Sequence, residues 1–417
     1  MEKAERTYFP KADFLHKYYY DIEKIVKNCS RCSNCKWIDQ WEIKEPRFSK
    51  VCPSVAYSYF DAYSSQGRHD IILAWLEGRM SPDMSENKML EVLYTCDTCG
   101  GCDASCKRSR DTEVIRMFLD VRAKLVEAGD VLPEHIPVIE SLRNEDNTMM
   151  GKKKDRGNWV SGLKVKDLTE EKAEVVFHAG CHISFNEDLW DVGKTAVKLL
   201  QKLGVDVGIF GKNETCCGTK AWDMGYRGEY KKYAENNVDA WSNAGVKTVI
   251  TACSDCYYAF KRLYPEKFEV YHIVEYIDKL IKEGKIKFTK TIPMTVTYHD
   301  PCHLGRRSNV YEPGKAIMGV YDPPRDILKS IPGIKLIEMY RIKEYAWCCG
   351  AGGGLREAYP ERSAWTANER ITEAVSTGAE AIVSACPWCE NNFNEAVRAC
   401  GAPIKVLDVL QLVDQAL

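Results

Sequence analysis

The 417-residue sequence has no long apolar run and almost no net charge. Its apolar stretches, such as residues 71–76, end far short of the roughly 18 residues that cross a bilayer, which argues against a direct membrane span. The 58 Lys and Arg residues stand against 60 Asp and Glu residues, a net charge of −2. That balance argues against a protein that coats nucleic acid.

The first residues also lack the features of a leader. Residues 1–6, Met-Glu-Lys-Ala-Glu-Arg, are followed by neither an apolar segment nor a small-residue cleavage site. The sequence therefore predicts a cytoplasmic protein, in which thiols stay reduced. Its 19 cysteines then indicate metal binding or redox chemistry, because disulfides are rare in that compartment.

The pattern of the chain divides it into a helical part and an α/β part. Residues 1–143 hold eight cysteines, and apolar residues recur at three- and four-residue steps over 70–78 and 112–129, which predicts helices. Residues 144–172 are polar and are expected to form a linker, in which Lys152 to Lys154 are either a solvated turn or a docking patch for an acidic partner. From residue 173 onward, short β-branched runs alternate with amphipathic segments, which is typical of a mostly parallel sheet covered by helices.

The α/β part repeats internally. Each copy, residues 173–290 and 291–417, carries five cysteines in the order Cys, Cys-Cys-Gly, Cys-x2-Cys. The sets are Cys181, Cys216, Cys217, Cys253 and Cys256, and Cys302, Cys348, Cys349, Cys386 and Cys389. The offsets between the copies are 121, 132 and 133 residues, so the second copy contains an insertion of eleven residues. We expect two pseudo-twofold-related cysteine-rich repeats with their sites near a shared face.

The eight N-terminal cysteines form two runs of three, each with a fourth cysteine. Three cysteines at three-residue spacing wrap a loop around one cubane cluster, and in two-cluster ferredoxins the fourth ligand comes from the other run. This predicts two cubane [4Fe–4S] clusters. Their ligands are Cys29, Cys32, Cys35 and Cys106 for one, and Cys96, Cys99, Cys102 and Cys52 for the other. Structural zinc is the alternative, although zinc sites generally use separated Cys-x2-Cys pairs.

Other residues near the ten C-terminal cysteines allow two interpretations each. Gly218 and Gly350 follow the cysteine pairs and would let the backbone approach a bulky inorganic group. His182 and His303 adjoin ligands, so they are candidate proton donors, or else buried histidines paired with backbone carbonyls. The run Cys386-Pro-Trp-Cys389 is either a reactive dithiol or, like its counterpart in the first repeat, a ligand pair.

Two further features of the sequence are not predicted to bind a metal or a cofactor. The glycine-rich stretch 350–354 is either a phosphate loop or a place of close backbone approach, and the latter is favoured because no βαβ dinucleotide context surrounds it. We therefore expect no flavin or NAD on this chain. Cys400 belongs to no set and is expected to be a small buried hydrophobe.

The motifs resemble those of the D-subunit family of heterodisulfide reductases, from about Cys29 to the C-terminus. The resemblance implies that each five-cysteine motif binds a non-cubane [4Fe–4S] cluster and that the pair faces a cavity where a disulfide is split. The stretches from Cys52 and Cys99 are similar to one component of the class II benzoyl-CoA reductase complex, a soluble, electron-bifurcating assembly of anaerobic bacteria. Partners would then be flavin- or ferredoxin-type redox subunits and a small disulfide.

Three functions remain open at this level. The chain carries electrons through the cubane sites to the non-cubane sites and reduces a disulfide there, or it relays electrons without a substrate of its own, or it is a zinc-stabilised scaffold. Eighteen of the 19 cysteines fall into the four ligand sets, which favours the redox interpretations.

Overall fold

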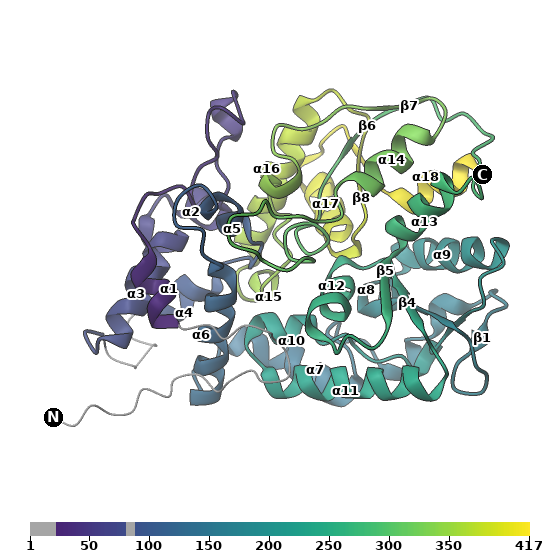
Figure 1. The fold of residues 1–417 in the computed structure, drawn as a ribbon, viewed down its shortest axis with the longest axis horizontal. Helices are drawn as coiled ribbons and strands as arrows, with labels where there is room; N and C mark the ends of the chain where they lie inside the picture. Colours follow the sequence, from purple (N-terminus) through teal and green to yellow (C-terminus); the bar gives the residue numbers. More distant parts are fainter. Residues whose placement is uncertain (1–21, 81–87) are drawn as a thin grey trace.

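The computed structural model describes residues 22–80 and 88–417. A helical domain lies at one end of the molecule and two α/β units lie at the other (Figure 1). No helix among these residues has the length and apolar content needed to cross a membrane.

The helical domain forms around two cysteine-bearing loops. Its regular pairing, within the described residues, is limited to one antiparallel bridge between Trp37 and Lys50. The side chain of Ser64 accepts a hydrogen bond from the amide of Gly67 and so starts α3. The predicted helices over 70–78 and 112–129 are confirmed as α3 and α6. The helices are α1 (Ile22–Asn28), α2 (Pro53–Ser58), α3 (Ser65–Leu76), α4 (Met89–Tyr94), α5 (Gly101–Cys106), α6 (Val114–Ala128) and α7 (Ile136–Glu145).

The first repeat is a parallel sheet of order β1-β3-β2-β4-β5. Its strands are β1 (Lys166–Asp167), β2 (Val175–His178), β3 (Val207–Ile209), β4 (Thr248–Thr251) and β5 (Glu269–His272). Its helices are α8 (Gly180–Phe185), α9 (Trp190–Lys202), α10 (Thr219–Met224), α11 (Arg227–Asn243), α12 (Ser254–Tyr258), which continues as a π-helical turn (Ala259–Leu263), and α13 (Ile273–Lys282).

The second repeat is a parallel sheet of order β7-β6-β8-β9. Its strands are β6 (Met294–Tyr298), β7 (Ile334–Leu336), β8 (Ala381–Ser384) and β9 (Lys405–Asp408). Its helices are α14 (Asp322–Ser330), α15 (Leu355–Ala358), α16 (Pro360–Ser376), α17 (Pro387–Cys400) and α18 (Val409–Ala416). The order β3-β2-β4-β5 of the first sheet matches it strand for strand, so the α/β prediction is confirmed.

The eleven inserted residues have a definite place in the second repeat. Helix α9 begins nine positions after Cys181, whereas α14 begins twenty positions after Cys302. The eleven extra residues therefore lie within the loop 303–321, which runs without regular helix or strand from the first cysteine of the second set to α14.

The segment 144–172 is more closely packed than the linker that we predicted. It contributes β1, which pairs with β3 and extends the first sheet. Trp159 and Arg156 are almost fully buried, although Lys152, Lys153 and Lys154 are exposed, as expected for a solvated turn. Composition alone did not indicate that this segment is packed into the fold, because the burial of Arg156 depends on partners far along the chain.

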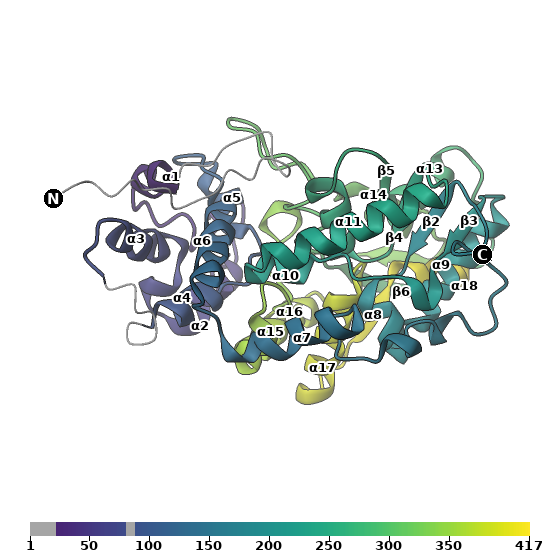
Figure 2. The same ribbon diagram turned by 90° about the horizontal axis from the view of Figure 1, so that it is seen from below.

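Three parts of the chain meet on the guanidinium of Arg122, which is fully buried on α6. One nitrogen donates to the carbonyls of Asp223 in the first repeat (2.9 Å) and Gly353 in the second (2.8 Å). The other donates to the carbonyls of Leu93 and Cys96 in the helical domain, both at 2.8 Å. Figure 2 shows α6 at this junction, beside α10. One side chain thus joins the helical domain to both repeats.

We expect Arg122→Met to destabilise the protein strongly, because it leaves four buried carbonyls without donors. The expected loss is at least about 3 kcal/mol, measured as a lowered melting temperature of the anaerobically purified chain. Arg398→Met is the matched control, since the side chain of Arg398 is 63% exposed. Equal melting temperatures of the two variants would contradict the role given to Arg122.

Candidate metal centre

The first N-terminal cysteine run surrounds a pocket together with the fourth cysteine of the other run. Cys29, Cys32, Cys35 and Cys106 all line it, as the predicted crossing of ligands requires, and Cys102 reaches it too. Arg31 and Ser33 adopt left-handed backbone conformations, φ 59° and 68°, which curl the loop so that the cysteines turn inward. Cys32 is exposed, so this site lies at the surface of the helical domain.

The second N-terminal set lies deeper. The charges of Cys96 and Cys99 raise the pKa of Cys52, in addition to the larger effect of burial, and Cys102 interacts with the same thiols. The guanidinium of Arg68 lies near Cys52 and Cys96 and opposes this rise. The structure therefore brings the predicted set Cys52, Cys96, Cys99 and Cys102 together, with Cys52 half-buried and the other three buried.

The two five-cysteine sets form one continuous row of buried thiols. Within each repeat the thiols follow one another in hydrogen-bond contact, in the same order in both copies. The two halves meet where Cys253 contacts Cys386. At the far end of the second half, Cys99 of the helical domain contacts Cys348 and packs with Cys302. The order is Cys181, Cys216, Cys217, Cys256, Cys253, Cys386, Cys389, Cys349, Cys348, and then Cys302 and Cys99.

Buried arginines supply positive charge at both ends of this row. Arg156 lies 3.7 and 3.8 Å from the sulfur of Cys181 through its two terminal nitrogens and forms an ion pair with Glu214 at 3.0 Å. Arg306 donates to the carbonyl of Cys99 (2.8 Å) and lies near the thiols of Cys302 and Cys348.

The thiols at the ends of the row favour the thiolate form. The hydrogen bond with Cys216 lowers the pKa of Cys181 to about 6, and that with Cys348 does the same for Cys99. The thiolate is the form of cysteine that binds metal. Gly180 also leaves space beside a sulfur, because a Cβ there would lie 2.9 Å from the sulfur of Cys256. Ten buried thiols with compensating cations fit iron–sulfur groups better than zinc, which takes four thiolates per ion.

Gly218 and Gly350 turn the backbone back toward the sulfur before them. Both have positive φ, 81° and 87°. The amide of Gly218 donates to the sulfur of Cys216 and that of Gly350 to the sulfur of Cys348, each at 3.3 Å. A Cβ would meet helix atoms on the other side, Tyr230 Cδ2 at 3.1 Å and the Ser363 carbonyl at 2.6 Å. The glycines are needed for this turn and for packing against α11 and α16.

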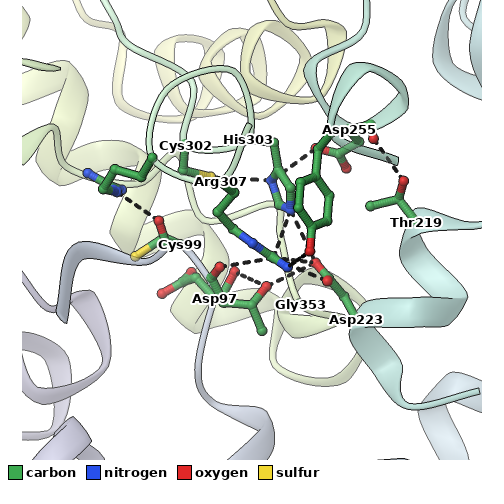
Figure 3. A network of polar contacts seen from close by, with 12 residues as sticks. Asp97, Cys99, Thr219, Asp223, Asp255, Cys302, His303, Arg307 and Gly353 are labelled. Atoms are coloured by element: carbon green, nitrogen blue, oxygen red, sulfur yellow. Dashed lines mark hydrogen bonds and ion pairs between the residues drawn. The ribbon is translucent and has the colours of Figure 1, made fainter. Parts of the chain in front are cut away.

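His303 occupies a polar network between the repeats (Figure 3). Its Nδ1 lies 3.2 Å from Asp255 and 3.5 Å from the sulfur of Cys302, and its Nε2 lies 3.3 Å from Asp223 and 2.9 Å from Arg307. Burial, the largest single effect, lowers the pKa of His303, but Asp255, Cys302 and Asp223 together outweigh it and the pKa lies well above its ordinary value.

His182 occupies the corresponding place in the first repeat but contacts an aromatic ring instead of carboxylates. Its ring packs edge-on against Trp388, with centroids 3.9 Å apart, and neither ring nitrogen has a hydrogen-bond partner among the described residues. Burial lowers its pKa to about 3, and Lys220 adds to this effect. Within the described part of the chain, neither candidate proton donor is paired with a backbone carbonyl. The two histidines differ because Asp255 and Trp388 hold equivalent positions in the Cys-x2-Cys loops.

Several residues of the site were not predicted. Arg156, Arg306, Arg307, Glu214, Asp223 and Tyr258 are charged or polar side chains buried at the row, and no local pattern distinguishes them from surface residues. The sequence could have pointed to Asp255 and Trp388, because each lies between the two cysteines of a predicted Cys-x2-Cys ligand pair. The expectation for Cys400 was wrong: it is exposed, since it ends α17 on the solvent side.

The glycine-rich stretch 350–354 packs against the helical domain. A Cβ at Gly352 would lie 2.7 Å from the Asp97 carbonyl, one at Gly353 would lie 2.6 Å from the Cys96 carbonyl, and one at Gly354 would meet His135. The backbone of residues 352–354 therefore lies directly against the helical domain, including the loop that carries Cys96 and Cys99. A Cβ would clash there, which explains why three glycines follow one another.

Gly350→Ala is expected to cost more stability than Gly378→Ala. Both glycines have positive φ, 87° and 75°, but the space beside Gly378 is open. Gly378→Ala should therefore cost only the backbone strain of about 1 kcal/mol, whereas Gly350→Ala must also displace the Ser363 carbonyl and disturb Cys348. Melting temperature and iron content measure the two effects. Equal losses in both variants would show that the packing at Gly350 is unimportant.

Comparison with known proteins agrees with this arrangement. Residues 175–261 and 296–394 each match the cysteine-rich domain family known as CCG. The D subunit of the dihydromethanophenazine:CoB–CoM heterodisulfide reductase of Methanosarcina mazei is 33% identical over 94% of this chain and 94% of its own length.

More distant relatives are also oxidoreductases. The EtfAB:quinone oxidoreductase of Syntrophomonas wolfei is 29% identical, covering 97% of this chain and 59% of that protein. The B subunit of the CoM/CoB fumarate reductase of Methanothermobacter marburgensis is 26% identical over 95% of this chain and 73% of its own length. The chain therefore belongs to the D-subunit family of heterodisulfide reductases, a family of iron–sulfur oxidoreductase components.

Proposed function

We propose that this chain carries electrons through two cubane [4Fe–4S] clusters to two non-cubane [4Fe–4S] clusters and reduces a small disulfide there. The row of contacting thiols carries the proposal, because it joins the helical domain to the second five-cysteine set through Cys99 and Cys348, and that set to the first through Cys386 and Cys253. The cubane ligands are the two crossed sets, and the non-cubane ligands are the two sets of five.

When bound, the clusters supply one electron at a time at low potential. Reduction of a disulfide takes two electrons and two protons, breaks the S–S bond and releases two thiols. The chain excludes water from the row, since its ten C-terminal cysteines are all buried. Arg156 and Arg306 offset the negative charge at its two ends.

The structure supports one order of electron flow. Cys32 is exposed in the helical domain, so electrons enter at the set that contains it. The crossed set with Cys99 follows, then the second repeat, then the first. The contact between Cys99 and Cys348 has no counterpart at Cys216 within the described residues, so the second repeat receives electrons before the first.

His303 is the better of the two predicted proton donors. Its Nδ1 lies 3.5 Å from the sulfur of Cys302, and the ring contacts Asp255, Asp223 and Arg307. Through these polar groups His303 can be reprotonated after it has given up a proton. His182 has no such polar partners among the described residues, because Trp388 covers its ring. We assign proton delivery to His303 and an apolar wall to His182.

The electron donor is a separate redox subunit of flavin or ferredoxin type, docking near Cys32. This agrees with the names of the relatives, several of which are subunits of reductases. The similarity to the benzoyl-CoA reductase complex stays a prediction, as does the absence of flavin and NAD from this chain.

Metal analysis and two alanine variants test the clusters and their order. Wild-type protein should contain about 16 iron atoms per chain, and Cys217→Ala and Cys349→Ala should each lose about four. Stopped-flow reduction by viologen should still reach the second site in Cys217→Ala, whereas Cys349→Ala should slow reduction of the first. About four zinc with negligible iron would instead show a scaffold, and first-site reduction in Cys349→Ala as fast as in wild type would refute the order.

Substitution of the two histidines tests proton delivery. His303→Gln should lower the rate of viologen-driven disulfide reduction by about 10²-fold, within the range for removal of a general acid, while His182→Gln should change it far less. Electron paramagnetic resonance must show intact clusters in both variants. Equal losses would refute the assignment, and reducible clusters without turnover of any disulfide would indicate a relay.

A further inference from the structure

A further histidine of the second repeat lies beside the second five-cysteine set. His299 directly follows β6 and is 1% exposed. One of its ring nitrogens lies within 4.8 Å of the sulfurs of both Cys349 and Cys389. Phe393 packs edge-on against the ring, with centroids 4.8 Å apart. The imidazole is therefore enclosed between an aromatic side chain and two of the predicted ligands.

A buried arginine decides which ring nitrogen of His299 carries the proton. Nε of Arg370, on α16, donates to Nδ1 of His299 at 3.1 Å. An arginine nitrogen can only donate, so Nδ1 is unprotonated and the single proton of the neutral ring lies on Nε2. Burial and the charge of Arg370 hold the pKa of His299 well below its ordinary value, which agrees with a neutral ring.

Arg370 is itself fixed inside the protein. Its Nη1 donates to the carboxylate of Glu373 at 2.7 Å and to the carbonyl of Arg341 at 2.9 Å. Glu373 also accepts from the amide and Nε of Arg341, at 2.7 and 2.9 Å. All three side chains are fully buried. The guanidinium of Arg370 cannot turn away from His299 without breaking a buried ion pair, which is strongly destabilising.

Nε2 of His299 thus has a proton to donate. It has no hydrogen-bond partner among the described residues, and a buried N–H without an acceptor is costly. The acceptor that its surroundings offer is the sulfur of the second five-cysteine set, at Cys349 and Cys389 or in a cluster that they bind. Hydrogen bonds to the sulfurs of a cluster are one of the ways in which a protein sets its reduction potential.

The equivalent histidine of the first repeat is held differently. His178 ends β2 and packs against Phe260, with centroids 4.9 Å apart, but neither of its ring nitrogens has a hydrogen-bond partner among the described residues. Burial lowers its pKa, so this ring is neutral too. Its Nδ1 faces the carboxylate of Glu214 at 3.7 Å. A carboxylate favours the proton on the nitrogen that it faces, which leaves Nε2 of His178 without one.

We infer that His299 donates a hydrogen bond from Nε2 to sulfur of the second site, that Arg370 is the positioning residue for this bond, and that His178 makes no such bond at the first site. The bond offsets the negative charge that the second site gains on reduction, so it raises the reduction potential of that site. This inference rests on the proposed function, because it takes both five-cysteine sets to hold iron–sulfur clusters.

Redox titration followed by electron paramagnetic resonance tests the bond. In holoprotein that carries Cys217→Ala, and so is expected to lack the first cluster, the second site is observed without overlap. His299→Leu exchanges one neutral side chain for another and should lower the ratio of reduced to oxidised second site about tenfold at a given potential, or about 59 mV for one electron. His299→Gln, which keeps an N–H donor, should restore most of this loss.

The matched control is the same change in the first repeat. In holoprotein that carries Cys349→Ala, His178→Leu should shift the potential of the first site far less than His299→Leu shifts that of the second. An unchanged second-site potential in His299→Leu would overturn the inference, as would equal shifts in the two repeats.

Arg370→Lys tests the positioning role. Lysine keeps a positive charge beside Glu373 but has a methylene group where arginine has Nε, so the proton of His299 is no longer confined to Nε2. The second-site potential should fall in the same direction as in His299→Leu. A wild-type potential in Arg370→Lys of unchanged iron content and melting temperature would refute the role of Arg370.

Pulsed electron paramagnetic resonance of protein labelled with ¹⁵N-histidine separates a hydrogen bond from a ligand. A weak coupling of the second site to one histidine nitrogen that is lost in His299→Leu would support the bond, whereas the strong coupling of a nitrogen bound to iron would overturn it. A shifted potential without turnover of any disulfide would support the inference and refute the proposed reduction. Wild-type protein without iron would refute both.

Discussion

The burial of eleven thiols in one row is the constraint on which the rest of the fold depends. Thiols that bind metal do so as thiolates, and negative charge in the interior is costly unless positive charge or hydrogen-bond donors lie beside it. The chain meets this requirement with Arg156 at one end and Arg306 at the other. It also turns the amides of Gly218 and Gly350 toward sulfur. Arg122 then holds the three parts together through backbone carbonyls, which keeps the row continuous across domain boundaries.

In the pseudo-twofold arrangement, both repeats hold their cysteines in the same order on matching sheets, but the side chains around the two sites differ. Each repeat presents a histidine to the Cys-x2-Cys loop of the other, His182 to Trp388 and His303 to Asp255. One position in each loop thus decides whether the opposite histidine is covered by an aromatic ring or joined to a carboxylate. The contact with Cys99 adds a second difference. A symmetric fold therefore holds two sites that are inequivalent in their charged neighbours and in their contact with the helical domain.

The sequence was sufficient for features that depend on local spacing. The parallel strands, the repeat, the insertion and the grouping of the cysteines all follow from periodicity and motif spacing, and the structure places Cys106 with the first run as the crossed pattern required. Features that depend on docking could not be predicted. The contact between Cys253 and Cys386 joins separate repeats, and Arg156 lies in a basic stretch that resembles a surface turn. Cys400 was misjudged because an amphipathic helix shows which residues alternate but not where the helix ends relative to solvent.

The burial of the row also sets the sequence of events by which the protein matures. Every cysteine of the two five-cysteine sets is buried, and the cysteines of the row come from all three parts of the chain, so the clusters are most easily inserted before these parts have packed together. The hydrogen bonds of Arg122, which join the three parts, are then expected to form late in assembly. Replacing a lost cluster would likewise require these parts to separate first, so the same packing that holds the thiols in place also slows their reloading.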